Sequence, residues 1–221
     1  MNDSLKIQSL RLEYPDKLLF DDINLTVAAG SLVVFETNVL DGATSLLKGI
    51  AGMLNNIQGQ VWLGDSNLLT LGAHERATRV GFVYEEQGLI SLYNVFQNIA
   101  LPLEFHTALN PNQMESRVLA TLDSLSIAPS LLEQQPHELN DVQTRLVNLA
   151  RALVIDPQLL LIDELEGGMP DDMIDRTIAM LIDRGKTLGS ITLMTSSHER
   201  ILREADRVLK IDDKQLRETE F

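Results

Sequence analysis

The chain has 221 residues, 44% of them hydrophobic, and carries 18 basic against 32 acidic side chains, a formal net charge of −14. This size and composition can bury a sizeable core in one domain, with room for a smaller helical lobe. The acidic balance argues against a nucleic-acid-binding face, and it is also unfavourable for an anionic nucleotide. The absence of cysteine excludes disulfides and thiolate metal sites and fits a reducing compartment.

No apolar run reaches the roughly 18–20 residues of a membrane-spanning helix, and the first residues, MNDSLKIQ, lack a basic and apolar leader. We therefore expect a protein with no membrane span of its own, which stays in the cytoplasm unless a partner holds it at a membrane. No internal repeat, low-complexity tract or linker interrupts the sequence, so we expect a single domain over residues 1–221.

Three strands are predicted before the first helix. Residues 5–14 alternate loosely between apolar and polar side chains, residues 18–27 follow a Pro-Asp-Lys turn, and residues 32–35 form an apolar run typical of a buried strand. After a short polar loop, residues 44–52 predict a helix with an apolar face. A strand, a tight loop and a helix in this order are the frame of a phosphate-binding P-loop.

Further strands are predicted at residues 60–63, 80–84, 159–163, 191–196 and 207–211, with a short helix at residues 73–77. A longer helix begins at Pro111, where Asn110 and Gln113 have the spacing of a capping box. Its predicted apolar stripe consists of Val118, Leu119, Leu122 and Leu125. The alternation of strands and helices predicts an α/β fold.

The segment TSLLKGIAG, residues 44–52, resembles the helix after the Walker A loop of ABC-type ATPases, where the usual run is G-x-x-G-x-G-K-S-T-L-L-x-x-I-A-G. In this alignment only Gly42 and the hydroxyls of Thr44 and Ser45 match the loop. The resemblance implies a P-loop NTPase-like ABC ATPase domain, in which a mixed sheet core is joined by an antiparallel β part and by a helical lobe at about residues 88–150.

The aligned loop lacks much of what a phosphate site needs. A working P-loop surrounds the phosphates with backbone N–H groups and adds a lysine. Here Ala43 replaces that lysine, and no lysine or arginine lies between Ser31 and Leu47. Leu40 stands where glycine would let the backbone approach, and Asp41 adds a negative charge. Losing the charged partner of a buried phosphate costs about 2–5 kcal/mol, and a like charge at about 4 Å costs up to about 4 kcal/mol.

Two other positions resemble nucleotide contacts of the family. Tyr14 follows the first strand, where the family places an aromatic ring that stacks on adenine; an edge tyrosine that packs on the sheet is an equally good interpretation. Glu85 stands where the family has a glutamine that reaches Mg²⁺ and the attacking water, and Gln87 follows two residues later. A carboxylate can bind Mg²⁺, so Glu85 alone would not abolish a site.

The segment VFQNIALPLEFHTALN, residues 95–110, resembles the ATPase subunits of MCE-associated phospholipid transporters. A similar "NVxLPL" run also occurs in lipoprotein exporters and other ABC subunits. His106 lies in this segment without a cluster of partners in the sequence, so we expect a surface or capping role for it.

The segment around residues 139–153 resembles the ABC signature region, where L-S-G-G-Q opens a helix that binds the γ-phosphate held by the opposite subunit. Leu139 and Gln143 match, but Asn140, Asp141 and Val142 replace the serine and both glycines. Asp141 is a good cap, yet it places a negative charge on an anion site. We favour the interpretation that this is a capped amphipathic helix and nothing more.

The run LLLID followed by Glu164 resembles Walker B, in which Asp163 would hold Mg²⁺ through water and Glu164 would polarise the attacking water. His198 resembles the switch histidine that senses the γ-phosphate. Residues 165–171 depart from the family's run toward the dimer contact, which leaves that contact open. If nucleotide binds, the expected site residues are Glu164 and His198 for catalysis, Tyr14, Gly42, Thr44, Ser45 and Glu85 for ATP, and Thr44 with Asp163 for Mg²⁺.

The resemblance covers nearly the whole chain, with the landmarks in the family's order. It implies a subunit that docks on transmembrane permease subunits at the inner face of the cytoplasmic membrane, as a homodimer or a heterodimer. Our first hypothesis is a pseudo-ATPase of a lipid transporter with a structural or regulatory role. The alternatives are a functional ATPase that energises lipid transport in the assembled complex, and a soluble interaction protein without a permease. ATP and Mg²⁺ are the expected cofactors if binding is retained; otherwise there are none.

Overall fold

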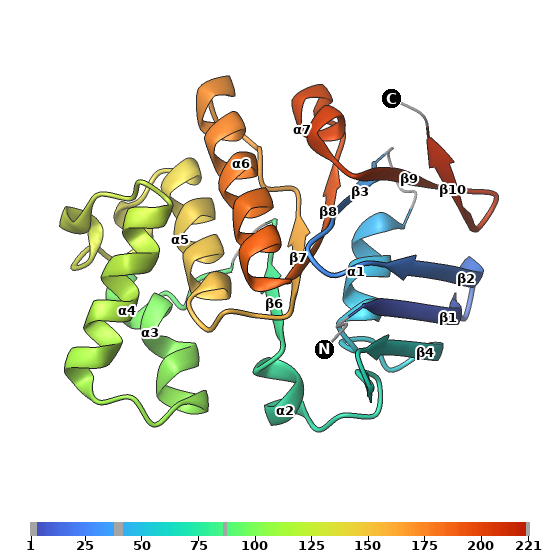
Figure 1. Ribbon diagram of the computed structural model, residues 1–221, viewed down its shortest axis with the longest axis horizontal. Helices are drawn as coiled ribbons and strands as arrows, with labels where there is room; N and C mark the ends of the chain where they lie inside the picture. Colours follow the sequence, from blue (N-terminus) through green and yellow to red (C-terminus); the bar gives the residue numbers. More distant parts are fainter. Residues whose placement is uncertain (1–3, 38–41, 86–87, 220–221) are drawn as a thin grey trace.

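Two β-sheets organise the chain in the computed structural model, which describes residues 4–37, 42–85 and 88–219 (Figure 1). The smaller sheet is antiparallel and has the strand order β2-β1-β4-β5. Its strands are β1 (Leu5–Tyr14), β2 (Lys17–Val27), β4 (Ile57–Leu63) and β5 (Ser66–Asn67). Side chains along β1 and β2 alternate between buried and exposed positions over much of their length, as expected where one face of a sheet covers a core.

The larger sheet has six strands in the order β10-β9-β3-β8-β7-β6. These are β3 (Leu32–Glu36), β6 (Val80–Val83), β7 (Leu159–Asp163), β8 (Ile191–Ser196), β9 (Arg207–Asp212) and β10 (Gln215–Thr219). All pairings are parallel except that of β10 with β9. Because the strands are parallel, the carboxyl ends of β3, β6, β7 and β8 lie together at one edge of the sheet. This edge holds the candidate site.

Helix α1 (Ala43–Ile50) lies between the two sheets (Figure 1). Its side chains Leu46, Leu47 and Ile50 are completely buried in one hydrophobic core with residues of both sheets. A second core covers the other face of the six-stranded sheet and includes residues of α6 (Asp171–Leu188) and α7 (Glu199–Glu204). The short helix α2 (Ala73–Ala77) precedes β6.

The helices α3 (Val95–His106), α4 (Pro111–Ser124) and α5 (Asp141–Leu153) form a group at one end of the molecule, termed here the helical lobe (Figure 1). Each begins with the same capping box, in which an asparagine Oδ1 accepts from the backbone N–H of a glutamine three residues later. Short 3₁₀ turns at Pro129–Leu131 and Pro136–Glu138 lie between α4 and α5.

The predicted strands and the capping box at Asn110 are confirmed. The predicted stripe of α4 is confirmed at Val118 and Leu122, which are completely buried, but it is wrong at Leu119, which is 38% exposed. The division of the chain into one domain over residues 1–221 with a lobe at 88–150 stays a prediction. No helix within the described ranges is long and apolar enough to cross a membrane.

Candidate functional site

Asp163, the last residue of β7, is the fixed point of the site. Its side chain is only 3% exposed, and its Oδ1 accepts hydrogen bonds from Thr44 Oγ1 and from Thr195 Oγ1, each at 2.9 Å. Thr195 Oγ1 also accepts the backbone N–H of Glu164 at 3.0 Å. The carboxylate is therefore held where α1, β7 and β8 meet, and the two residues that the family resemblance assigns to Mg²⁺, Thr44 and Asp163, are in contact.

Gly42 forms the turn into α1. Its φ angle of 93° lies in the left-handed region, and an added Cβ would lie 2.9 Å from Leu19 Cγ, so the position requires glycine. The Gly42 carbonyl accepts the backbone N–H of Leu46 at 2.9 Å. The preceding Leu40 and Asp41, on which part of the sequence argument rests, lie outside the described residues.

Ala43, at the position of the expected lysine, is the first residue of α1 and is 2% exposed. Its methyl group belongs to the hydrophobic core that α1 shares with both sheets. The next two residues, Thr44 and Ser45, are both half-buried in the first turn. This end of α1 therefore offers two hydroxyls and an apolar methyl group, but no side-chain cation.

The carboxylates around Glu164 influence one another. Burial raises the pKa of Glu164, and the negative charges of Glu85, Glu166 and Asp163 raise it further, while Arg145 acts in the opposite direction. Arg145 Nη1 donates to the Glu164 carbonyl oxygen at 2.6 Å. Three acidic side chains thus add negative potential at a fourth, which is unfavourable for a triphosphate.

Ser196 and Glu166 form a contact that the sequence analysis missed. Ser196 is the last residue of β8 and is completely buried, and its Oγ donates to Glu166 Oε1. The backbone N–H of His198 donates to Ser196 Oγ at 3.0 Å. His198 precedes α7, and its Nδ1 is buried without a hydrogen-bond partner. A serine at the end of a buried strand was the available signal, because strand ends of a parallel sheet point into such sites.

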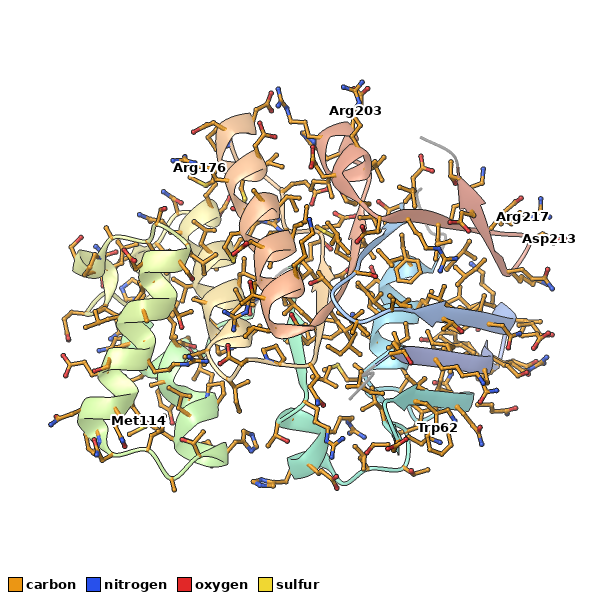
Figure 2. All side chains as sticks on the ribbon, in the orientation of Figure 1. Trp62, Met114, Arg176, Arg203, Asp213 and Arg217 are labelled. Atoms are coloured by element: carbon orange, nitrogen blue, oxygen red, sulfur yellow. The ribbon has the colours of Figure 1, made fainter. Side chains whose placement is uncertain are left out.

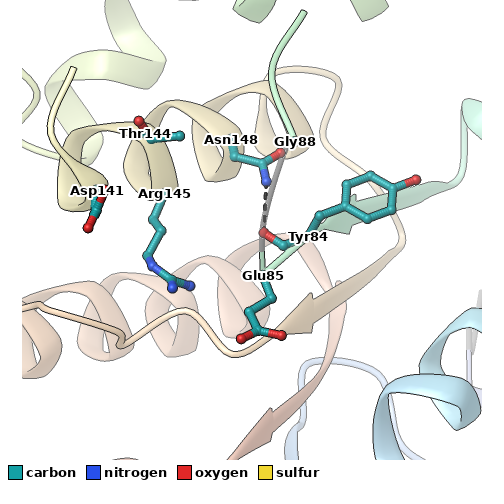
Figure 3. Close-up of a pocket in the computed structure, with 7 residues that line it drawn as sticks. All are labelled: Tyr84, Glu85, Gly88, Asp141, Thr144, Arg145 and Asn148. Carbon is teal, nitrogen blue, oxygen red and sulfur yellow. Dashed lines mark hydrogen bonds between the residues drawn. The ribbon is translucent and has the colours of Figure 1, made fainter. Parts of the chain in front are cut away.

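A cavity of about 310 Å³ lies between α5 and the end of β6 (Figure 3). Its lining includes Glu85 and Asp141, the two acidic replacements that the alignment singled out, together with Arg145. Among the described residues, the lining consists of Tyr84, Glu85, Gly88, Asp141, Thr144, Arg145 and Asn148. The neighbouring Gln87 lies outside the described residues.

Asn140 is the N-cap of α5. Its Oδ1 accepts the backbone N–H of Gln143 at 2.8 Å, and its own N–H donates to Gln143 Oε1 at 2.9 Å. The predicted capped helix is confirmed, with Asp141 in the first turn, and the expectation that the segment does nothing more stays a prediction. Tyr14, by contrast, ends β1 opposite Lys17 and is 37% exposed.

His106 has a partner that the sequence did not indicate. Its ring centre lies 4.7 Å from that of His74.

The residues of the candidate site fit Mg²⁺ better than they fit phosphate. Thr44 Oγ1 and Asp163 Oδ1 are separated by 2.9 Å, which is about the spacing of two neighbouring oxygen ligands around Mg²⁺. Across the described residues no group of three or more histidine, aspartate or glutamate side chains could hold a metal ion. Mg²⁺ would therefore need oxygen ligands from phosphate and water. A phosphate group at this site would lie near acidic side chains, and Ala43 stands at the position of the lysine.

The sequence profile of the ABC transporter family matches residues 20–166. The chain belongs to the ABC transporter family. Among its relatives in that family, the methionine import ATP-binding protein MetN of Francisella tularensis subsp. holarctica (strain OSU18) is 29% identical over 216 residues. The intermembrane phospholipid transport system ATP-binding protein MlaF of Haemophilus influenzae is 30% identical over 224 residues, which cover 98% of this chain and 83% of MlaF.

The MetN alignment covers 94% of this chain but only 61% of the relative, so this chain spans about three fifths of the MetN length. The sulfate/thiosulfate import ATP-binding protein CysA of Xanthomonas campestris is 34% identical, over 92% of this chain and 60% of CysA. The fold agrees with that of the ATP-binding cassette MJ0796 in its dimeric state with ADP and Pi, at a TM-score of 0.89 with 98% of both chains covered. That structure is 20% identical to this chain, and the predicted ABC ATPase fold is confirmed.

Proposed function

We propose that this chain is the ATP-binding-cassette-type subunit of a membrane transporter of lipid, MCE-associated type, and that it hydrolyses little or no ATP. Its role would be mainly structural or regulatory. The lipid assignment draws support from MlaF, which aligns over 83% of its own length and whose name states phospholipid transport. The segment at residues 95–110 supports the same assignment.

One observation carries the proposed loss of hydrolysis. The position of the phosphate-binding lysine is the buried methyl group of Ala43, directly beside the Thr44 and Asp163 pair that would hold Mg²⁺. Burial raises the pKa of Glu164, and the carboxylates near this pair raise it further. A triphosphate would bring further negative charge to this place without a compensating side-chain cation.

Docking on permease subunits would use the segment between β6 and α3. Three apolar side chains in this segment are exposed: Leu92 at 86%, Ile90 at 38% and Tyr93 at 36%. Exposed apolar side chains that are close in sequence are a feature of protein contact surfaces. With this docking, the subunit would lie at the inner face of the cytoplasmic membrane, alone or in a homodimer or heterodimer.

The alternative of an active ATPase in the assembled transporter is favoured by a different observation. Asp163 and Glu164 are both present, and Thr44 contacts Asp163 as an Mg²⁺ site requires. In this case Glu164 would act on the attacking water, and His198 would contact the γ-phosphate. Tyr14, Gly42, Ser45 and Glu85 would complete the nucleotide contacts. The third hypothesis is a soluble interaction protein without a permease.

The test is Mg-ATP hydrolysis by the purified chain and by the complex that copurifies with it. The proposal predicts the same background rate for the native chain and for Glu164→Gln, with Glu115→Gln on the exposed face of α4 as a control. Hydrolysis that is lost only in Glu164→Gln would establish the active-ATPase alternative. Copurification without any integral membrane protein would favour the soluble interaction protein.

A further inference from the structure

Two polar side chains of α5, Arg145 and Asn148, link the helical lobe to the α/β part, in addition to the hydrophobic core that both parts share and the contact of Arg184 with the Leu153 carbonyl. Arg145 and Asn148 are three residues apart, so both project from the same face of the helix. This face is directed toward the end of β6: Figure 3 shows Arg145 and Asn148 projecting from α5 toward Tyr84 and Glu85. Each side chain makes a hydrogen bond to a backbone carbonyl of the α/β part and lies against a glycine there.

Asn148 contacts the end of β6. Its side chain is 3% exposed, and Nδ2 donates to the Tyr84 carbonyl oxygen at 3.0 Å (Figure 3). On its other side, Oδ1 accepts from Arg151 Nη2 at 3.0 Å, which fixes the orientation of the amide. A Cβ added to Gly88 would lie 2.1 Å from Nδ2. Only glycine at position 88 therefore leaves room for this asparagine.

Arg145 contacts the segment after β7 in the same way. Nη1 donates at 2.6 Å to the carbonyl oxygen of Glu164, a residue whose φ angle of 46° is in the left-handed region. A Cβ added to Gly167 would lie 2.7 Å from Nη2. A non-glycine residue in this conformation costs free energy. The hydrogen bond from Arg145 therefore also stabilises the backbone that orients Glu164.

We propose that Arg145 and Asn148 form a clasp that holds the helical lobe in one orientation on the α/β part. Two hydrogen bonds from one rigid helix, each backed by a glycine, restrain both tilt and rotation of α5. Through the Glu164 carbonyl, Arg145 is also a positioning residue for the carboxylate. This inference goes beyond the proposed function, because it concerns the orientation of the lobe and holds whether or not ATP is hydrolysed.

The clasp is tested by a distance measurement between the lobe and the α/β part of the full-length chain. Because the chain has no cysteine, Glu115→Cys on α4 and Asp65→Cys after β4 can carry two spin labels without background labelling. Both positions are exposed. We expect one narrow distance distribution for the doubly labelled parent. A broad distribution in the parent would overturn the proposal.

The asparagine contact is then broken from either side. Asn148→Asp keeps the shape and the Arg151 partner but removes the donor to Tyr84, and Gly88→Ala displaces the asparagine. Each should broaden the distribution and raise the population of a displaced lobe by on the order of tenfold, as expected for one lost hydrogen bond. In an Asn148→Ala background, Gly88→Ala should add nothing further, because the clash is gone. Additive effects of these two substitutions would contradict the clasp.

The arginine contact has matched variants. Arg145→Ala should broaden the distribution, and Arg145→Lys, which keeps a donor for the Glu164 carbonyl, should restore it in part. Arg203→Ala and Asn112→Ala are the controls, since both side chains are exposed; Figure 2 shows Arg203 at the outer surface. Circular dichroism identifies any variant that does not fold, and the variants of the other contact then test the proposal. Unchanged narrow distributions in folded Asn148→Asp and Arg145→Ala would overturn the proposal.

Discussion

Thr44 Oγ1 donates a hydrogen bond to Asp163 Oδ1 at 2.9 Å, and so joins the first turn of α1 to the end of β7. The two residues are 119 positions apart in the sequence. Their contact brings the expected Mg²⁺ ligands together, although the lysine that would accompany them is replaced by Ala43. Under the proposed function, these two residues could still hold Mg²⁺, while the side-chain cation expected for phosphate is absent at position 43.

Thr44→Val tests what the contact contributes to stability. The substitution keeps the shape of the side chain but leaves Asp163, 3% exposed, with one of its two hydroxyl donors. We expect the free energy of unfolding in urea to fall by about 1–3 kcal/mol, the cost of an unsatisfied buried acceptor. Ser45→Ala in the same helical turn is the control. Equal stabilities of Thr44→Val and the parent would show that Asp163 does not depend on this donor.

Asp156 joins two arginines from different helices. It forms ion pairs with Arg117 of α4 and Arg184 of α6, and these arginines also donate to the carbonyls of Val154 and Leu153 at 2.9 and 2.8 Å. Burial lowers the pKa of both arginines, and their mutual repulsion adds to the effect on Arg117.

Removing the shared carboxylate leaves two like charges facing each other. We expect Asp156→Asn to lower the free energy of unfolding by about 1–3 kcal/mol, because the side chains are only partly buried. Asparagine is chosen since residue 156 has a φ angle of 52°, which asparagine tolerates. Arg176→Ala, which breaks only the exposed pair with Asp172, is the control and should change stability by less than about 0.5 kcal/mol. A similar loss in both variants would contradict this prediction.

Glu164→Gln should stabilise the fold at neutral pH. Because burial and then the neighbouring charges raise the folded-state pKa of Glu164 above 4.5, its ionised form is less favourable in the folded chain than in the unfolded one. Stability is therefore lost as the pH rises from about that ordinary value through the folded-state pKa. The advantage of the glutamine variant should grow over this range and vanish below it.

Urea unfolding of the parent and of Glu164→Gln at a series of pH values measures this difference. The control is Glu115→Gln, an exposed change of the same kind on α4. If the parent becomes the more stable protein as the pH rises, the carboxylate is stabilised in the fold and the electrostatic description of the site is wrong.

Leu92→Asp tests the docking surface. The side chain is 86% exposed, so a charge there should leave the free energy of unfolding nearly unchanged while it prevents burial against a permease. We expect copurification with membrane proteins to be lost. Leu188→Asp at the end of α6, where the leucine is 51% exposed, is the matched control and should copurify normally. Retention of the membrane partner by Leu92→Asp would place the docking surface elsewhere.

Local sequence patterns were sufficient for much of the fold. The bounds of β1, β7 and β8 were predicted correctly, because apolar runs and alternation are local signals. Helix α6 was not predicted, although it is the longest helix among the described residues. Its amphipathic pattern, with buried Ile174, Ile178 and Leu181, is a local signal in a stretch that begins where the sequence departs from the family's motif.

The contacts of the site were predictable only where the resemblance to the ABC family supplied them. It indicated that Thr44 and Asp163 would come together. It did not indicate that Glu166 pairs with Ser196, or that Asn148 lies against Gly88. The end of a buried strand was a local signal for Ser196, but the partners of Ser196 and Asn148 depend on how distant segments are placed in three dimensions, which no periodicity or local propensity encodes. The same holds for Arg145, whose partner is a backbone carbonyl and leaves no trace in residue type.

Calorimetric titration of Mg-ATP into the native chain, beside the triple variant Ala43→Lys, Asp41→Ser, Leu40→Gly, tests most directly whether nucleotide binding is lost. We expect no measurable binding to the native chain and micromolar affinity in the variant, because Thr44 and Asp163 are in contact while Ala43 replaces the lysine. Micromolar binding by the native chain would contradict the proposed loss, since a substitute phosphate contact would then exist and the active-ATPase alternative would take its place.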